Sequence, residues 1–171
     1  MITLVTGGAR SGKSRYAQEQ ALTESQQPVY VATAKVWDED FAQRIQRHKT
    51  ERGPQWTNYE EELYVSQLPL VGKTVVVDCV TLWLTNFFTL HDYDADKTLA
   101  ALQAEIDALQ QQQGHFLIVT NEIGMGVHAE TAVGRKFTDL QGWANQYIAR
   151  IADTVVLMIS GIPVVIKKQE K

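Results

Sequence analysis

Residues 7–14 read Gly7-Gly8-Ala9-Arg10-Ser11-Gly12-Lys13-Ser14, and they match the phosphate-binding pattern G-x-x-x-x-G-K-S/T at every fixed position. The apolar run at 2–6 is typical of a buried strand, and residues 14–22 have the composition and spacing of a helix. A strand, a glycine-rich loop and a helix in this order are the context that the motif requires. The segment therefore predicts a loop that binds the phosphates of a nucleotide.

The residue types in this loop explain why it would bind phosphate. Glycines allow a tight turn that aims successive backbone N–H groups at one point, and the following helix adds its positive end. The ammonium of Lys13 can reach the outer phosphates, and the hydroxyl of Ser14 can bind Mg²⁺. We expect a nucleoside triphosphate site with Mg²⁺ as cofactor and with Lys13 as a catalytic residue.

Apolar runs and helical segments alternate along the rest of the chain. Further strands are predicted at 29–33, 73–78, 115–120 and 154–159, with helices at 38–49, 81–90, 99–109 and 135–151. A short apolar run at 164–166 is predicted to return as an edge strand. The pattern indicates an α/β, P-loop NTPase-like fold: a mostly parallel sheet with helices on both faces and a C-terminal antiparallel edge strand. Residues 55–69 are predicted as loop and a short helix, and Gly114 as a helix C-cap.

Length and composition narrow the class of protein. The 171 residues fit a single domain, 1–171, and 44% hydrophobic residues are enough for a substantial core. The net charge of −4 gives no broad basic surface, so we expect no nucleic-acid partner. The one cysteine, Cys79, has no partner for an internal disulfide, and no apolar run approaches the roughly 20 residues of a membrane span. We expect a cytoplasmic protein with no signal peptide.

Two acidic residues stand where predicted strands end. Ligands of parallel α/β sheets bind at the carboxyl ends of the strands, so acids at these positions are candidate site residues. Asp78 follows an apolar strand, as the Mg²⁺-coordinating acid of phosphate-loop nucleotidases does, although an acid here can also cap the next helix. Glu122 is a weaker candidate for the same role. Either carboxylate could instead meet a hydroxyl of the substrate.

His48 is the histidine with the most suggestive surroundings. It shares a predicted helix face with Phe41 and Ile45, and several cationic residues lie near it in sequence. Nearby cations favour the neutral imidazole, which is the form that can attack phosphorus. From this spacing alone, a packed or surface histidine remains the more common reading.

The chain resembles one family along nearly its whole length: the bifunctional adenosylcobinamide kinase/adenosylcobinamide-phosphate guanylyltransferases of cobalamin nucleotide-loop assembly. Several segments match besides the phosphate loop. They are Tyr-Val-Ala-Thr-Ala at 30–34, Arg-Ile-x-x-His-x-x-x-Arg at 44–52, Trp56 with Glu60, Asp-Cys-Val-Thr at 78–81, Thr-Asn-Glu-Ile-Gly-x-Gly at 120–126 and Ser-Gly-Ile-Pro at 160–163. One departure is Thr57, which follows Trp56 where the family usually places a basic residue.

This resemblance implies two reactions on ATP and GTP as substrates. A nucleoside triphosphate phosphorylates the hydroxyl on the aminopropanol arm of adenosylcobinamide, and GTP then gives GMP to that phosphate through a GMP–histidine intermediate at His48. The implied partners are corrinoids and nucleotides, and the implied assembly is a homotrimer. The nucleotide contacts implied by the matching positions are residues 7–14, Ala32, Thr33, Ala34, Lys49, Thr50, Glu51, Arg52, Glu60 and Asp78, with Ser14 and Asp78 at the metal.

Two other readings keep the phosphate loop and differ in chemistry. An ordinary small-molecule kinase would use the triphosphate without forming an adduct on His48. A GTP-binding switch protein would need a segment that reads guanine, and no Asn-Lys-x-Asp sequence is present.

Overall fold

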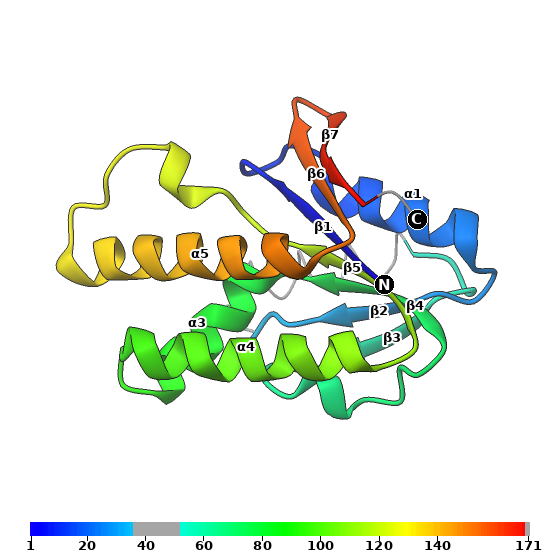
Figure 1. The fold of residues 1–171 in the computed structure, drawn as a ribbon, viewed down its shortest axis with the longest axis horizontal. Helices are drawn as coiled ribbons and strands as arrows, with labels where there is room; N and C mark the ends of the chain where they lie inside the picture. The colour runs from blue at the N-terminus through cyan, green and yellow to red at the C-terminus, as the bar shows by residue number, and fades with distance from the viewer. Residues whose placement is uncertain (36–51, 170–171) are drawn as a thin grey trace.

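The computed structural model describes residues 1–35 and 52–169. They form a seven-stranded sheet in the order β3-β2-β4-β5-β1-β6-β7 (Figure 1). Neighbouring strands from β3 to β6 are parallel, and β6 and β7 are antiparallel. The bounds are β1 (Ile2–Gly7), β2 (Val29–Ala32), β3 (Thr57–Glu60), β4 (Lys73–Asp78), β5 (Gly114–Val119), β6 (Thr154–Ile159) and β7 (Ile162–Lys168). The predicted fold class and its antiparallel edge strand are confirmed.

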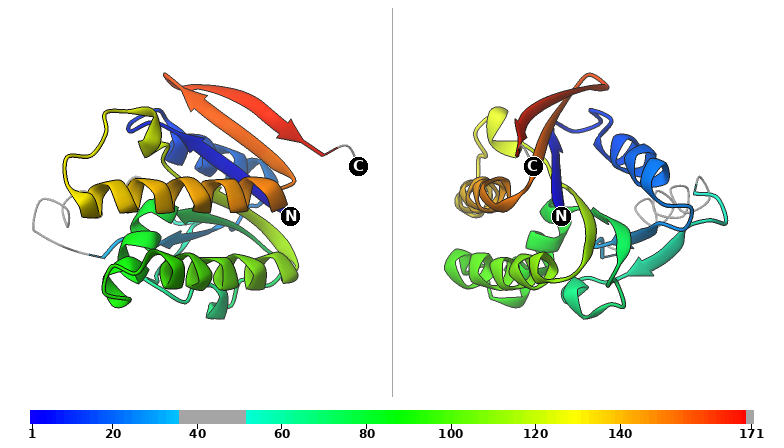
Figure 2. Two further views of the ribbon diagram at one scale, coloured as in Figure 1. Left: turned by 60° about the vertical axis from the view of Figure 1, so that its left-hand side comes forward. Right: turned by 45° about the vertical axis from the view of Figure 1, so that its right-hand side comes forward.

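Helices cover both faces of this sheet, as the right-hand view of Figure 2 shows. Helix α1 (Lys13–Glu24) lies on one face. The other face carries α3 (Val80–Leu90), α4 (Ala95–Gln111) and α5 (Ala132–Ile151). Two short 3-10 turns, η1 (Val65–Gln67) and η2 (Ile123–Met125), lie in the connections from β3 to β4 and from β5 to α5. The described helices lie close to the predicted positions, although α4 starts four residues and α5 three residues earlier than their spacing indicated.

Alternate residues of the central strands enter two separate hydrophobic cores. In β5, Phe116 and Ile118 pack with α3, α4 and α5, whereas Leu117 and Val119 pack with α1. The narrow α1 layer is possible because Ala17 and Ala21 face the sheet with fully buried small side chains. Each central strand is therefore apolar on both faces, which is why its sequence reads as a continuous run.

Two sequence expectations were wrong in detail. Residues 57–60 form β3, not loop, and they pair with β2 although the strand is largely exposed and has no apolar run. Gly114 begins β5 and does not cap α4, whose C-cap is Gln112. A Cβ on Gly114 would lie 2.7 Å from the carbonyl oxygen of Lys73, so close strand contact explains this glycine. The helix predicted at 38–49 lies outside the described residues.

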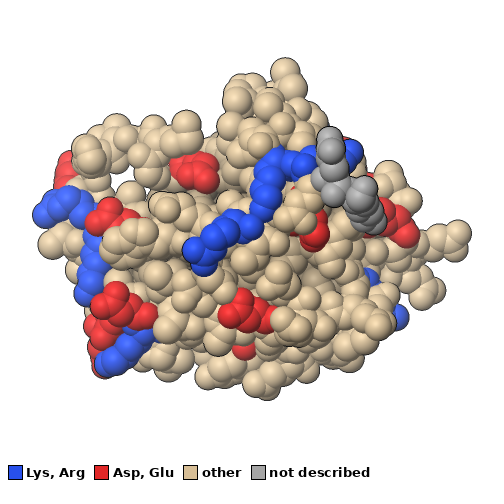
Figure 3. All heavy atoms as spheres, viewed as in Figure 1, with Lys and Arg blue, Asp and Glu red and all other residues tan. Residues whose placement is uncertain are grey.

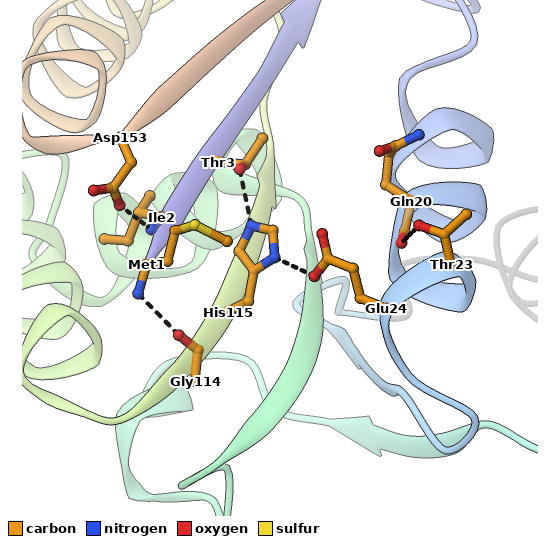
Figure 4. A network of polar contacts seen from close by, with 9 residues as sticks. All are labelled: Met1, Ile2, Thr3, Gln20, Thr23, Glu24, Gly114, His115 and Asp153. Atoms are coloured by element: carbon orange, nitrogen blue, oxygen red, sulfur yellow. Dashed lines mark hydrogen bonds and ion pairs between the residues drawn. The ribbon is translucent and has the colours of Figure 1, made fainter. Parts of the chain in front are cut away.

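A set of polar contacts joins the first residues of the chain to their surroundings at the amino ends of β1 and β5 (Figure 4). Nδ1 of His115 lies 2.5 Å from Oε2 of Glu24 at the end of α1, and its Nε2 lies 2.9 Å from Oγ1 of Thr3. The terminal ammonium donates to the carbonyl of Gly114, and the N–H of Ile2 donates to Asp153. His115 therefore joins α1 to two strands, which is a structural role.

Two further observations concern the charges on the surface and the hydropathy of the helices. On the face drawn in Figure 3, acidic and basic side chains lie scattered among a majority of uncharged residues. Within 1–35 and 52–169, no helix has the length and apolar content needed to cross a bilayer.

Candidate active site

The phosphate-binding loop joins β1 to α1, and its backbone requires glycine at two positions. Gly7 has φ 146° and Gly12 has φ 95°. A Cβ on Gly7 would lie 2.5 Å from the carbonyl oxygen of Met158 in β6, so the neighbouring strand leaves no room for a side chain. The loop is thus packed against β6, and the N-terminus of α1 opens onto the carboxyl edge of the sheet, where a helix start favours anions.

Lys13 is the first residue of α1 and is only 7% exposed. Its ammonium donates a 2.6 Å hydrogen bond to the carbonyl oxygen of Gly8, within the same loop. Burial lowers the pKa of Lys13, and the negative charge of Asp78 acts in the opposite direction. A phosphate would be a stronger partner for this ammonium than the neutral carbonyl, because both groups would then be charged.

A pocket of about 630 Å³ opens over the loop. Residues 9–14 form one wall, and Asp78, Cys79 and Asn121 contribute to the other. This volume lies in the range of small-molecule sites. The structure therefore brings the predicted Lys13, Ser14 and Asp78 to one pocket. Because β5 lies between β1 and β4, the residues that follow β5 come between the loop and Asp78.

Asp78 is held from β2 by a residue that the sequence reasoning did not single out. The phenol of Tyr30 donates a 2.7 Å hydrogen bond to Oδ2 of Asp78. Burial, reinforced by this carboxylate, raises the pKa of Tyr30 well above its ordinary value, so the phenol stays a donor. The match of residues 30–34 to the family was the signal that could have found it.

Arg52 stacks on the ring of the same tyrosine. Its guanidinium carbon lies 3.7 Å from the centre of the Tyr30 ring, and its Nε donates to Oδ1 of Asn58 at 2.7 Å. Trp56 meets the ring edge-on, with 6.1 Å between ring centres. Arg52, which is predicted to contact the nucleotide, is therefore connected to Asp78 through the side chain of Tyr30. Asn58, beside the unusual Thr57, positions it.

The predicted segment 32–34 lies against the turn that follows Asp78. Oγ1 of Thr33 donates to the carbonyl of Cys79 at 2.8 Å and accepts from the N–H of Cys79 at 2.9 Å. Asn86 in α3 donates to the carbonyl of Thr33. The Thr33 side chain is fully buried and has protein partners, so it shapes the turn. Contact of Ala32, Thr33 and Ala34 with a nucleotide stays a prediction.

The remaining predicted residues differ in where they lie. Ala9 and Arg10 are exposed on the loop, and Glu60 is exposed at the end of β3. The proposed nucleophile His48, together with Lys49, Thr50 and Glu51, lies outside the described residues. Their roles stay predictions.

The donors around the loop fit the Mg²⁺ ion that the sequence predicts. Mg²⁺ prefers oxygen ligands and is commonly bound by one or two carboxylates together with substrate phosphates. The Ser14 hydroxyl and the Asp78 carboxylate line the same pocket, and the hydrogen bond from Tyr30 occupies only one of the two Asp78 oxygens. The second oxygen and the hydroxyl are the protein groups that would hold the ion.

These features are those of a nucleotide-binding enzyme of the P-loop class, with the phosphate-binding loop at the carboxyl edge of a parallel sheet. The chain belongs to the cobinamide kinase/cobinamide phosphate guanyltransferase family, whose family model matches residues 3–166. The resemblance noted in the sequence is therefore confirmed. The chain is an adenosylcobinamide kinase and guanylyltransferase of adenosylcobalamin biosynthesis.

Three relatives support this assignment. The bifunctional adenosylcobalamin biosynthesis protein CobU of Escherichia coli (strain K12) is 38% identical, over 98% of this chain and 100% of the relative. CobU of Salmonella typhimurium is 36% identical, over 98% and 100%, and CobP of Pseudomonas aeruginosa is 33% identical, over 98% of each.

Solved structures support the fold alone. A KaiC-like protein of Pyrococcus horikoshii OT3 matches with a TM-score of 0.55 and 15% identity, over 99% of this chain and 79% of the other. A second protein from this organism has a TM-score of 0.56 and 9% identity, with 99% and 87% coverage.

Proposed function

We propose that the enzyme carries out its guanylyl transfer through a covalent GMP–His48 intermediate, after it has phosphorylated the aminopropanol hydroxyl of adenosylcobinamide. The observation that supports this most is the common pocket of Lys13, Ser14 and Asp78 in a chain of this family. One triphosphate site can serve both steps, because each step needs the same polyphosphate tail to be held.

In the kinase step, the loop N–H groups and Lys13 hold the outer phosphates in line with the attacking hydroxyl. Phosphoryl transfer depends mainly on such positioning and on neutralising the charge that develops. Lys13 already lies inside the loop, so its ammonium needs only to exchange its carbonyl partner for phosphate oxygens.

In the guanylyl step, a neutral His48 attacks the α-phosphorus and pyrophosphate leaves, held by the same loop. The resulting P–N bond is reactive, so the phosphate of the acceptor can displace the imidazole. Arg52 anchors the chain next to this site through its stacking on Tyr30. His48 precedes it by only four residues in sequence, a length that reaches at most about 14 Å.

Mg²⁺ would be held by Ser14 and Asp78, and when bound it neutralises charge on the phosphates. The protein residues supply the rest of the site: Tyr30 orients Asp78, and the loop amides bind oxygen atoms of the phosphates. We take GTP as the donor of GMP, and GTP or ATP as the phosphoryl donor.

We further propose that residues 1–171 act as one domain within a homotrimer, in the cytoplasm. Exposed apolar side chains on the β6–β7 hairpin support the assembly. Ile159, Ile162 and Val165 are 53%, 65% and 55% exposed in the single chain, and such clusters are typical of contacts between proteins. The cytoplasmic location follows from the nucleoside triphosphates that the enzyme consumes.

The direct test is to trap the intermediate. Wild-type protein is incubated with Mg²⁺ and α-labelled GTP, denatured, and analysed by peptide mass spectrometry. We expect a guanylate on the peptide that contains His48. Label that is lost on denaturation under every condition would reduce the proposal to an ordinary kinase.

A further inference from the structure

The carboxylate of Glu122, directly after β5, is fixed from two sides. Oγ1 of Thr6 in β1 donates to its Oε1 at 2.8 Å, and Nδ2 of Asn145 in α5 donates to the same oxygen at 3.0 Å. The N–H of Glu122 donates to the carbonyl of Gly7, the first loop glycine. Oε2 accepts no hydrogen bond from the residues that the structure describes. Glu122 thus lies beside the phosphate loop with one free oxygen.

A buried polar network keeps Asn145 in the orientation that binds Glu122. Its Oδ1 accepts hydrogen bonds from Thr120 at 2.7 Å and from Gln141 at 2.9 Å. Thr120 and Gln141 are 0% and 1% exposed. Burying so many polar groups is costly unless they are well paired. This packing holds the half-exposed carboxylate of Glu122 in one orientation, as a functional group requires.

Glu122 lines a slot of about 340 Å³ that differs from the nucleotide pocket. Its walls include Gly8 of the loop and the apolar side chains of Met125, Leu157 and Met158. The slot also contacts Ser11, whose hydroxyl is buried and has no hydrogen-bond partner among residues 1–35 and 52–169. An unpaired buried hydroxyl is unfavourable, so this group favours a polar ligand. The slot therefore combines apolar walls with a carboxylate and an unpaired hydroxyl.

We propose that this slot receives the hydroxyl-bearing aminopropanol arm of the acceptor and that Glu122 is the base of the kinase step. The proposal rests on the phosphorylation of that arm under the proposed function. The carbon atoms of the arm contact Met125 and Leu157, and its hydroxyl donates to Oε2 of Glu122. Because Gly8 and Ser11 belong to both the slot wall and the phosphate loop, the arm lies next to the phosphates that it attacks.

The step balances as a single displacement. The hydroxyl oxygen forms a bond to the γ-phosphorus while the bond from that phosphorus to the β–γ bridging oxygen breaks. The hydroxyl proton moves to Oε2 of Glu122, and the nucleoside diphosphate leaves with the bond electrons. The proton then passes to solvent when the product departs. Oε1 keeps its bonds to Thr6 and Asn145 throughout.

The guanylyl step has no hydroxyl to deprotonate, which makes the proposal testable. Glu122→Gln keeps an oxygen that can accept from Thr6 and Asn145, so the fold should hold, but its amide cannot take a proton. We expect the kinase kcat to fall by about 100-fold, in the usual range for a general base, with the KM for the nucleotide nearly unchanged. Formation of the GMP adduct from GTP, which needs no acceptor, should fall far less.

The matched control is Glu19→Gln, which removes a carboxylate from the exposed face of α1. Circular dichroism and thermal unfolding check the fold of both variants, and titration with a non-hydrolysable triphosphate measures nucleotide affinity. A kinase kcat of Glu122→Gln within about threefold of wild type would overturn the proposal. So would weakened triphosphate binding or equal loss of both steps, because Glu122 would then serve the nucleotide or its metal. Absence of phosphorylation in wild type would instead refute the proposed function.

Discussion

The phenol of Tyr30 and the carboxylate of Asp78 form a 2.7 Å hydrogen bond between β2 and β4, and the guanidinium of Arg52 covers the same ring at 3.7 Å. This contact connects the chain just after the predicted His48 segment to the acid expected to bind Mg²⁺. Orientation of Asp78 therefore depends on β2 as well as on its own strand.

Tyr30→Phe should lower the free energy of unfolding by about 1.5–3 kcal/mol, because a buried hydrogen bond to a charged group is lost. The ring stays, so stacking of Arg52 is preserved. A double-mutant cycle with Asp78→Ala, which removes the acceptor, measured by urea denaturation, isolates the coupling between the two side chains. Additive effects of the two substitutions would mean that the hydrogen bond contributes nothing.

Lys13→Ala should lower the rates of both reactions by about 100-fold or more, because each loses the cation that stabilises negative charge on the phosphates. Steady-state kinetics of kinase and guanylyltransferase steps measure the effect. Lys73→Ala, at the exposed start of β4, is the control and should leave both rates unchanged. Full kinase activity in the Lys13 variant would place the phosphate site elsewhere.

His48→Ala should abolish the GMP adduct and guanylyl transfer while substantial kinase activity remains, because only the second reaction needs a nucleophile on the protein. His91→Gln is a matched control at a ring that stacks on Phe87. Equal loss of both activities in a folded variant would contradict the assigned role.

His115→Ala should reduce the free energy of unfolding by about 1–3 kcal/mol, because Thr3 loses a partner and the end of α1 loses its link to the sheet. Both rates should stay within about twofold of wild type, since this contact lies at the start of β1 whereas the phosphate loop follows its end. Chemical denaturation and kinetic assays measure the two quantities. A large loss of rate with unchanged stability would refute a structural role.

Cys79 should resist alkylation until the protein unfolds. Burial raises the pKa of its thiol to about 12, so almost no thiolate exists in the folded protein at pH 8. In the unfolded chain its pKa is about 8.5, and labelling becomes fast. Iodoacetamide labelling with and without denaturant checks this. Rapid modification of the folded protein would show that the turn after Asp78 opens readily.

Much of the fold was predictable because the central strands are apolar on both faces and the phosphate loop is explicit in sequence. Residues 57–60 were missed because an edge strand needs only one backbone partner and leaves Thr57 and Asn58 exposed. Lys13 and Ser14 were predicted from the phosphate-loop pattern, and Asp78 was predicted because it ends an apolar strand. The role of Tyr30 and the hydrogen bonds that hold Glu122 were not predicted. Tyr30 and Asn145 meet their partners only when strands and helices that are distant in sequence pack together.

The bond from Lys13 to the Gly8 carbonyl has a consequence for ligand choice. Every anion that binds must compete with the Gly8 carbonyl for the ammonium of Lys13. The net gain in binding free energy is therefore small for a compound with little negative charge. A polyphosphate competes more strongly than the carbonyl because it carries several negative charges, and those charges raise the pKa of Lys13, which burial lowers. The loop without ligand therefore favours polyphosphates over nucleosides and monophosphates, whatever their base or sugar.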